Sequence, residues 1–177
     1  MLESLPPCLK NNASVHYLPR SKLIQDNFPA FTNLSIAGNY GAGISAMNTL
    51  HSEILEELVI GNYSFPDCRQ LSFHQLPKLK SIRIGMHCCY ISRNNGMRDT
   101  SSLCIIDCQS LQSLEIGSYS FFDYTSFEVR SCDALSSITF GEYCFHSITN
   151  VNFAGRIAKE CFCFSWYSVE INSAFGI

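Results

Sequence analysis

A glycine-containing stretch carries the pattern closest to a cofactor site. Gly41-Ala-Gly43-Ile-Ser-Ala46 fits a relaxed dinucleotide-binding fingerprint and follows the strand-like Leu34-Ser-Ile36. In that fingerprint the first glycine turns the chain at the end of a strand, and the pyrophosphate rests on a helix N-terminus. Gly41 comes five residues after Ile36, which disfavours nucleotide binding. We therefore expect a glycine-rich loop or a short helix on the convex side of the fold. Apolar residues spaced like a helix face follow it, namely Ile44, Met47, Leu50 and Ile54.

Ten cysteines in 177 residues could form disulfides or bind a metal. No Cys-x-x-Cys occurs, His87-Cys88-Cys89 would need a second ligand pair, and Cys161-x-Cys163 is too tight for the usual zinc spacing. Cys108, Cys132 and Cys144 occupy fixed positions of a repeat described below, and a buried free cysteine behaves as a small hydrophobe. We expect structural, reduced thiols, with disulfides as the alternative, and no metal site.

Other catalytic or binding chemistry has less support. Gly43-Ile-Ser45-Ala-Met47 lacks the second glycine of a nucleophile elbow, and the five histidines include no i, i+4 pair. A net charge of -3 gives no basic footprint for nucleic acid, and no apolar run approaches the roughly 20 residues that span a bilayer. We predict no enzyme, no cofactor, no nucleic-acid partner and no membrane insertion. The N-terminus has no apolar signal core, so we expect a cytoplasmic protein on the sequence as given, or a cell-surface one if the chain is a fragment.

One phrase recurs along the chain and indicates the elements that position these residues. It appears as Leu55-Glu-Glu-Leu58-Val-Ile60-Gly61, Leu79-Lys-Ser-Ile82-Arg-Ile84-Gly85, Leu111-Gln-Ser-Leu114-Glu-Ile116-Gly117 and Leu135-Ser-Ser-Ile138-Thr-Phe140-Gly141. Phe31-Thr-Asn-Leu34-Ser-Ile36 opens the same phrase, and Trp166-Tyr-Ser-Val169-Glu-Ile171 echoes it. The spacing of these copies predicts a unit of about 24 residues. The longer steps, from Leu79 to Leu111 and from Leu135 to Trp166, place extra residues in the third and fifth coils.

Two further phrases complete the unit. Alternating segments recur as Leu71-Ser-Phe73, Leu103-Cys-Ile105, Phe127-Glu-Val129 and Val151-Asn-Phe153, and a Tyr-x-Phe phrase recurs with its Phe at positions 65, 121 and 145. Short alternation is a strand signal, and we interpret the repeated Phe as core. A single coil buries too little apolar surface to fold alone, whereas stacked coils share one core. We predict a β-rich repeat solenoid, with parallel strands stacked in coils of about 24 residues and a second, narrower sheet.

At these residues the chain resembles leucine-rich repeat proteins of the BspA-like type. Units of that type carry an Ile-Gly, an Ala-Phe-like pair, a Cys and a Leu-x-x-Ile-x-Ile strand; the matching words here are Ile116-Gly117, Ser120-Phe121, Cys132 and Leu135-Ser-Ser-Ile138-Thr-Phe140. The resemblance covers positions 23 to 175, but Phe121 and Cys132 lie much farther apart than the corresponding residues of the family. It implies a curved scaffold that binds protein or glycan, with some members acting as surface adhesins, and no catalytic residues.

The domain organisation follows from the limits of the repeat. Residues 1–22 are expected to form an N-terminal cap or arm, and residues 23–177 the leucine-rich-repeat-like solenoid. The last coil has no polar closing segment, although repeat arrays usually need one and an open edge strand invites pairing. Either the sequence is incomplete or a partner covers this end. End-to-end self-association through the C-terminal coil is therefore an expectation.

The residue between the last two apolar positions of each main phrase should face outward. That column is Ser35, Val59, Arg83, Glu115, Thr139 and Glu170, and a second outward column begins at Asn33 and Glu57. The extra residues of the third coil, between His87 and Ser101, contain Asn94-Asn95-Gly96 and are expected to leave the solenoid as an exposed loop. The candidate partner-binding surface is Val59, Arg83, Glu115, Thr139, Arg93 and Arg98.

These patterns favour a non-catalytic module that presents a solenoid surface to a protein, or to a glycan. Three alternatives remain at this point: a merely solvated face, a fragment of a secreted or cell-surface adhesin-like repeat protein, and a nucleotide-binding enzyme that uses the Gly41-Gly43 loop. The last alternative requires that Gly41 and Gly43 cap a helix beside a parallel sheet.

Overall fold

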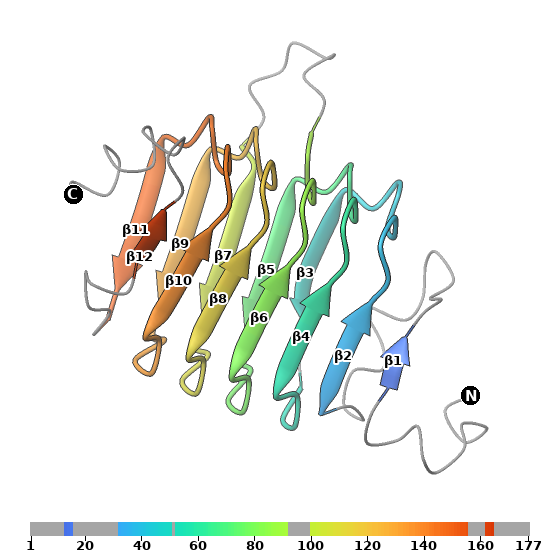
Figure 1. Ribbon diagram of the computed structural model, residues 1–177. Coiled ribbons are helices and arrows are strands. Elements are labelled where there is room, and N and C mark those ends of the chain that lie inside the picture. Colours follow the sequence, from blue (N-terminus) through green and yellow to red (C-terminus); the bar gives the residue numbers. More distant parts are fainter. Residues whose placement is uncertain (1–12, 16–31, 51, 92–99, 156–161, 165–177) are drawn as a thin grey trace.

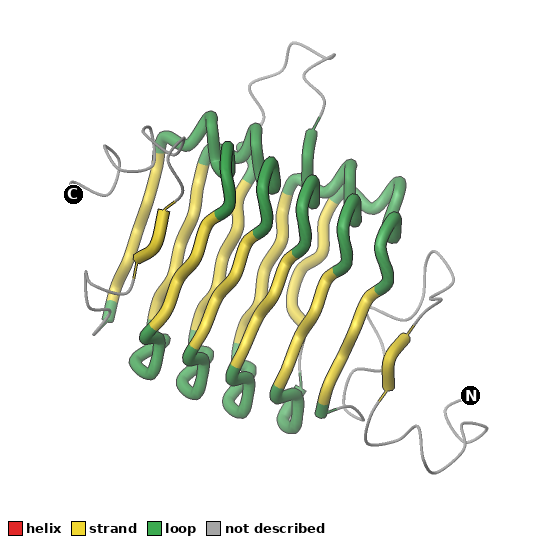
Figure 2. The backbone as a smooth tube through the Cα atoms, in the orientation of Figure 1, coloured by secondary structure: helices red, strands yellow, loops and turns green. Residues whose placement is uncertain are grey.

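The computed structural model of the protein describes residues 13–15, 32–50, 52–91, 100–155 and 162–164. These residues form twelve strands and no helix (Figure 1). The strands wind as a β-solenoid of about five turns of about 24 residues. Figure 2 shows the two layers of strands, with the described loops, in green, at both edges of the solenoid. The prediction of a parallel, β-rich solenoid is confirmed.

Sheet A contains seven parallel strands in the order β1-β2-β4-β6-β8-β10-β12. Its strands are β1 (Ala13–Val15), β2 (Asn33–Ile36), β4 (Glu57–Ile60), β6 (Ser81–Ile84), β8 (Ser113–Ile116), β10 (Ser137–Phe140) and β12 (Phe162–Phe164). From β2 to β10 the sheet consists of the repeated Leu-x-Ile segments, and its apolar positions pair with one another: Leu58 with Ile82, Ile82 with Leu114, and Leu114 with Ile138.

Sheet B contains five parallel strands in the order β11-β9-β7-β5-β3. Its strands are β3 (Ala46–Leu50), β5 (Gln70–His74), β7 (Ser102–Ile106), β9 (Ser126–Arg130) and β11 (Asn150–Ala154). Four of these contain the second repeated phrase, as predicted. The register of sheet B follows that of sheet A, with Leu71 beside Leu103 and Leu103 beside Phe127.

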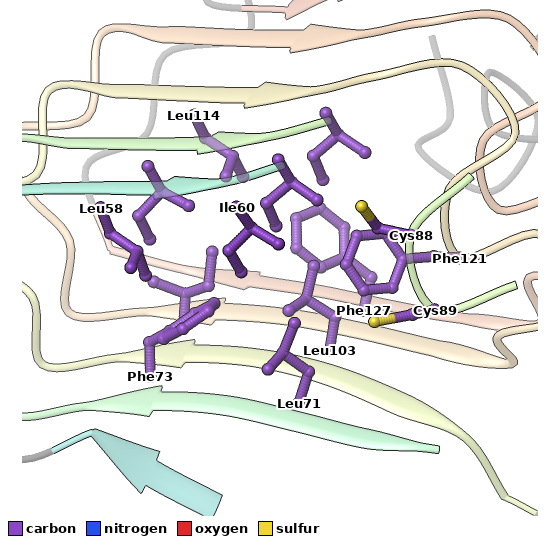
Figure 3. Packing of buried hydrophobic residues seen from close by; sticks show 14 of the residues in the cluster. Leu58, Ile60, Leu71, Phe73, Cys88, Cys89, Leu103, Leu114, Phe121 and Phe127 are labelled. Atoms are coloured by element: carbon purple, nitrogen blue, oxygen red, sulfur yellow. The ribbon is translucent and has the colours of Figure 1, made fainter. Parts of the chain in front are cut away.

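The core lies between the two sheets, because every second side chain of each strand points inward. Figure 3 shows Leu58 and Ile60 of sheet A packed opposite Leu71 and Phe73 of sheet B. The two predicted columns of sheet A are buried: Leu58, Ile82, Leu114 and Ile138 in one, and Ile60, Ile84, Ile116 and Phe140 in the other. Each coil thus contributes apolar side chains that only its neighbours can cover, which is how a solenoid gains stability by stacking.

The turns that leave β4, β6, β8 and β10 depend on a column of glycines, Gly61, Gly85, Gly117 and Gly141. A Cβ atom on Gly117 would lie 2.6 Å from the carbonyl carbon of Gly85, and one on Gly61 would lie 2.4 Å from the nitrogen of Gly38. Real Cβ atoms do not approach a backbone so closely, so neighbouring coils meet at main-chain contact here. This explains why the repeated phrase ends in glycine.

Two residues after each of these glycines the backbone is left-handed at a residue other than glycine. The φ angles are 59° at Tyr63, 54° at His87, 60° at Tyr119 and 56° at Tyr143. In this conformation Tyr63 donates its backbone N–H to the carbonyl of Met86 at 2.8 Å, and Tyr119 donates to that of Glu142 at 2.7 Å. Bonds between coils therefore offset a backbone conformation that residues with a Cβ rarely adopt.

In the third coil the exposed loop that the sequence predicts is too long. The turn from His87 to Cys89 repeats the turn from Tyr63 to Phe65, and Cys88, Cys89 and Ser101 are buried. These residues belong to the solenoid and not to an exposed loop, so the prediction for 87–101 was too wide. By this alignment the extra residues fall at 92–99, outside the described residues. The error arose because this turn reads His87-Cys88-Cys89, so the repeated Tyr-x-Phe phrase cannot be recognised in it.

The fifth step of the repeat is also corrected. The strand that pairs with β10 is β12, with Phe162 beside Ile138 and Phe164 beside Phe140. The step from Ile138 to Phe162 is as long as the step from Leu114 to Ile138, so no extra residues precede β12, and the predicted longer step to Trp166 is wrong. In this register Lys159 falls where the repeated Leu is expected, which is why the phrase was not recognised. The Trp166-to-Ile171 segment lies outside the described residues.

Sheet A also extends toward the N-terminus. β1 pairs with β2 in parallel, with Ala13 beside Leu34 and Val15 beside Ile36. This strand lies within residues 1–22, for which the sequence predicts a cap or arm.

Candidate binding surfaces

The outward column of sheet A forms as its alternation predicts. Val59, Arg83, Glu115 and Thr139 lie side by side on β4, β6, β8 and β10. Arg83 donates from Nε to Oε2 of Glu115 at 2.7 Å, with side chains 65% and 50% exposed. An ion pair this exposed typically contributes between zero and about 1 kcal/mol. Its contribution to folding is therefore small.

Small polar residues flank this ion pair. The second outward column of sheet A consists of Glu57, Ser81, Ser113 and Ser137 on the same four strands. The short side chains of Ser81 and Ser113 cannot shield Arg83 or Glu115 from a partner, so both charged groups are accessible on this face. The predicted contributions of Arg93, Arg98 and Glu170 lie outside the described residues.

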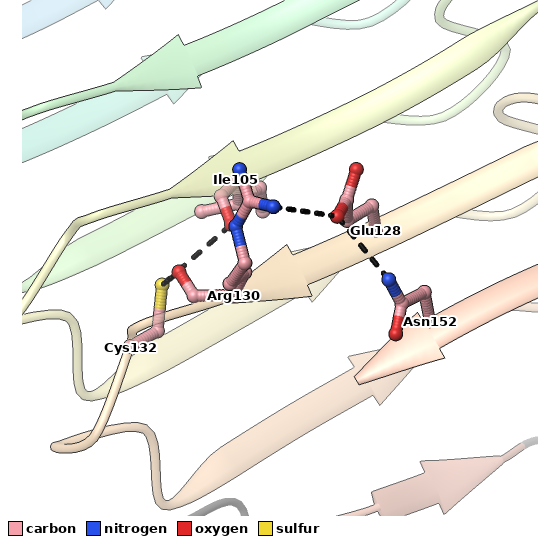
Figure 4. Close-up of polar contacts among 5 residues, drawn as sticks. All are labelled: Ile105, Glu128, Arg130, Cys132 and Asn152. Carbon is pink, nitrogen blue, oxygen red and sulfur yellow. Dashed lines mark hydrogen bonds and ion pairs between the residues drawn. The ribbon is translucent and has the colours of Figure 1, made fainter. Parts of the chain in front are cut away.

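The outer face of sheet B carries a different polar group. Arg130 and Glu128 lie 3.7 Å apart, and Asn152 donates from Nδ2 to Oε1 of Glu128 at 3.2 Å (Figure 4). Cys104, on the neighbouring strand, is half-buried, and burial raises the pKa of its thiol. A raised pKa lowers the thiolate fraction, so this sulfur is a poor nucleophile.

The seven cysteines that the structure describes outside β12 are free thiols. Cys108, Cys132 and Cys144 are buried, which confirms their predicted role as core fillers. Hydrogen bonding to Cys132 and burial hold the pKa of Cys108 well above its ordinary value, and burial raises the pKa of Cys144 to about 12. Thiols in this state are protonated at neutral pH and act as packing groups.

Cys89 occupies the position that Phe65, Phe121 and Phe145 take in other coils. A tyrosine from the next coil compensates for the smaller side chain. Tyr124 is fully buried and donates its hydroxyl to the carbonyl oxygen of Cys68 at 2.8 Å, a residue two coils away. A large side chain in the next coil thus accompanies the small one at Cys89, which helps to keep the core filled.

The edge that leads from sheet A to sheet B carries stacked aromatic rings, and we call this the aromatic edge. Its first row is Tyr63, His87, Tyr119 and Tyr143, with ring centroids 5.1, 4.9 and 5.0 Å apart and planes 5°, 2° and 20° from parallel. Its second row is Tyr90, Phe122 and His146, with centroids 5.4 and 4.7 Å apart; Phe122 and His146 stack, whereas Tyr90 is tilted by 43° from Phe122. The repeated Tyr was visible in the sequence, but its stacking was not predicted.

The glycine stretch of the first coil is a loop that leads into a strand. Gly41 and Gly43 have φ angles of 80° and 81°, and a Cβ on Gly41 would lie 2.4 Å from the ring of Phe65. The chain then enters β3, so the helical alternative and the predicted helix face are wrong. Without a helix N-terminus after Gly43, the arrangement that a dinucleotide-binding loop needs does not form here.

Within the described residues no group of three or more His, Cys, Asp and Glu side chains could hold a metal ion. The same part of the chain forms no helix long and apolar enough to cross a membrane. The fold defines the protein as a β-solenoid repeat protein. No family model matches the chain, and no curated protein or solved structure matches it.

Proposed function

We propose that this protein is a non-catalytic binding module that holds a protein partner on the outer face of sheet A. The observation that carries the proposal is the exposed Arg83–Glu115 ion pair in the middle of the outward column. Charges that contribute little to folding are free to contribute to recognition, and a partner placed there would contact β4, β6, β8 and β10 at once.

The resemblance to BspA-like leucine-rich repeat proteins supports the same proposal. Members of that type bind protein or glycan on a repeat scaffold, and the Leu-x-x-Ile-x-Ile strands that recur at a regular step are the feature shared with this chain. We favour a protein over a glycan because the outward column of sheet A consists of Val59, Arg83, Glu115 and Thr139 and offers no aromatic ring for a sugar to stack on.

The test compares two Arg-to-Glu variants on opposite faces. Extract from the native source is passed over immobilised wild type, Arg83→Glu and Arg130→Glu. Both variants change the net charge by the same amount and place a Glu beside an existing Glu, on sheet A and on sheet B respectively. A partner lost from Arg83→Glu alone supports the proposal. Equal recovery by all three proteins contradicts it.

A charge-swapped variant separates recognition from folding. Arg83→Glu combined with Glu115→Arg restores the ion pair but reverses its direction on the surface. We expect melting temperatures of all variants close to wild type, since surface substitutions usually change stability by less than about 0.5 kcal/mol. The swapped protein should fold as wild type does and still fail to recover the partner.

A further inference from the structure

The aromatic edge exposes side chains that the core does not use. Tyr63 is 50% exposed and Tyr90 is 39% exposed, and Met86, beside the first row, is 42% exposed. The inward residues of the same turns, Phe65 and Phe121, are fully buried and complete the core. Aromatic rings gathered outside a finished core, over four successive coils, form a surface available for binding.

The way the rings stack limits what this surface can hold. Within the first row each ring lies nearly parallel to the next, at centroid separations of 4.9 to 5.1 Å, so His87 and Tyr119 are covered on both faces. A sugar stacks on an open ring face, and the interior of the row offers only ring edges and hydroxyl groups. Tyr63 differs, because the equivalent residue of the preceding coil is Asn39, which has no ring. One face of Tyr63 is therefore left without an aromatic neighbour in the row.

The charged side chains that the structure describes in the turns of this edge are of one sign. Asp67, Asp123 and Glu142 lie in the turns that carry the rings. Among the described residues of these turns, at 37–45, 61–68, 85–91, 117–125 and 141–149, there is no Lys or Arg; Arg69 comes after the turn, directly before β5. Acidic groups beside aromatic rings complement a cation that can both stack on a ring and donate hydrogen bonds to a carboxylate.

We propose that the aromatic edge binds an arginine-containing, extended segment of a partner protein. A guanidinium group is planar and stacks on aromatic faces, and its five N–H donors match carboxylates and tyrosine hydroxyls. Tyr63 provides a half-exposed ring with one face that has no aromatic neighbour in the row, and Asp67 provides a carboxylate in the same turn. The hydroxyls of Tyr119 and Tyr143 extend the site along the solenoid. This surface is separate from the outer face of sheet A, and the proposal does not depend on the function proposed for that face.

The test uses the full chain and three labelled peptides of one Gly-Ser backbone, which carry four arginines, four lysines or four glutamates. Binding is measured by fluorescence anisotropy. We expect the arginine peptide to bind about three- to tenfold more tightly than the lysine peptide, because Lys lacks the planar group that stacks. The glutamate peptide should not bind. Equal affinity for the arginine and lysine peptides would overturn the proposal, because net charge alone would then account for the binding.

Two variants on the edge and one matched control locate the site. Tyr63→Asn removes the half-exposed ring but keeps a residue that tolerates the left-handed backbone, as Asn39 does in the preceding coil at a φ of 60°. Asp67→Asn removes one negative charge and keeps an oxygen that can accept the N–H of Gly43, now bonded at 2.7 Å. Asp107→Asn makes the same charge change on the opposite edge, at a left-handed residue that also suits Asn.

We expect Tyr63→Asn and Asp67→Asn each to weaken arginine-peptide binding by about three- to tenfold, and Asp107→Asn to leave it unchanged. If all three variants bind like wild type, the proposal is wrong. If Tyr63→Asn fails to fold in a melting experiment, Asp67→Asn still tests the site. Binding of neutral oligosaccharides that is lost in Tyr63→Asn, without arginine-peptide binding, would assign the edge to a glycan and also overturn the proposal.

Discussion

The two edges of the solenoid satisfy the same backbone requirement with different side chains. At the aromatic edge the first left-handed residues of the turns are Tyr63, His87, Tyr119 and Tyr143, each followed two residues later by a second one, and at the opposite edge the left-handed residues are Gln75, Asp107 and Ser131. Tyr63, His87 and Tyr119 at the first edge, and all three residues at the second, donate a backbone N–H to the next coil, as Gln75 does to Ile106 at 3.0 Å. Small polar residues are the more usual choice for this conformation. The turn therefore does not require rings, and the aromatic side chains need another explanation.

The inward residues of the two edges also differ. Phe65, Phe121 and Phe145 fill the core at the aromatic edge, whereas Leu76, Cys108 and Cys132 fill it at the opposite edge. The first edge is thus lined by rings inside and outside, and the second carries smaller groups inside and polar groups outside. The inner residues of both edges therefore contribute to folding, and the outer rings are available for binding.

The largest expected effect comes from the inner residue of the aromatic edge. Phe121 is fully buried and stacks on Phe145 with centroids 5.2 Å apart. Phe121→Ala should lower the free energy of unfolding by about 3 to 5 kcal/mol, measured by urea denaturation. Cys132→Ala at the opposite edge removes a single buried sulfur and should cost about 1 kcal/mol. Equal losses would show that the two edges contribute alike to the core.

Two neighbouring residues on β8 allow the stability cost of a buried substitution to be compared with that of an exposed one. Leu114 is fully buried and Glu115 is exposed. Leu114→Ala should cost about 2 to 5 kcal/mol and Glu115→Ala less than about 0.5 kcal/mol, on the same urea curves. A similar cost for both substitutions would contradict the alternation that places one inside and one outside.

Alkaline pH should destabilise the protein through its buried thiols. Cys144 has a pKa raised to about 12 in the fold, against an ordinary value of 9.0. Below pH 9 the thiol is protonated in both states and its contribution is fully present. Between pH 9 and 12 the unfolded chain loses this proton and the folded chain keeps it. The free energy of unfolding then falls by up to about 1.4 kcal/mol per pH unit for this group.

Denaturation curves at pH 8 and pH 10 measure that loss. Cys144→Ala removes the group, so the variant should lose less stability than wild type over the same interval. An identical loss in both proteins would mean that the Cys144 thiol ionises as freely in the fold as in the unfolded chain.

The smallest expected effect is on the outer ring of the aromatic edge. Tyr63→Asn should change the melting temperature little, corresponding to less than about 0.5 kcal/mol, because half of the ring is exposed and Asn suits its left-handed backbone. A loss of several kcal/mol would show instead that the outer stack holds the coils together. The difference between the two edges would then be one of folding and not of recognition.

Much of the fold could be predicted because the same pattern of apolar residues recurs in successive coils. The columns headed by Leu58 and Ile60, the parallel register and the burial of Cys108, Cys132 and Cys144 follow from the regular repeat step and the alternation of apolar residues. The outward pairing of Arg83 with Glu115 follows from the same register. The predictions failed where one residue broke the phrase, at Cys89 in the third coil and at Lys159 before β12.

The sequence by itself determined the period, the alternation and hence which side chains of each strand are buried, because these depend on residues close together in the chain. Only the tertiary structure decided how the coils meet. Tyr124 reaches the carbonyl of Cys68 two coils away, and Tyr63, His87 and Tyr119 stack although each belongs to a different coil. These contacts exist only after each coil closes on the one before it, and no local pattern records the direction in which an outer ring then points.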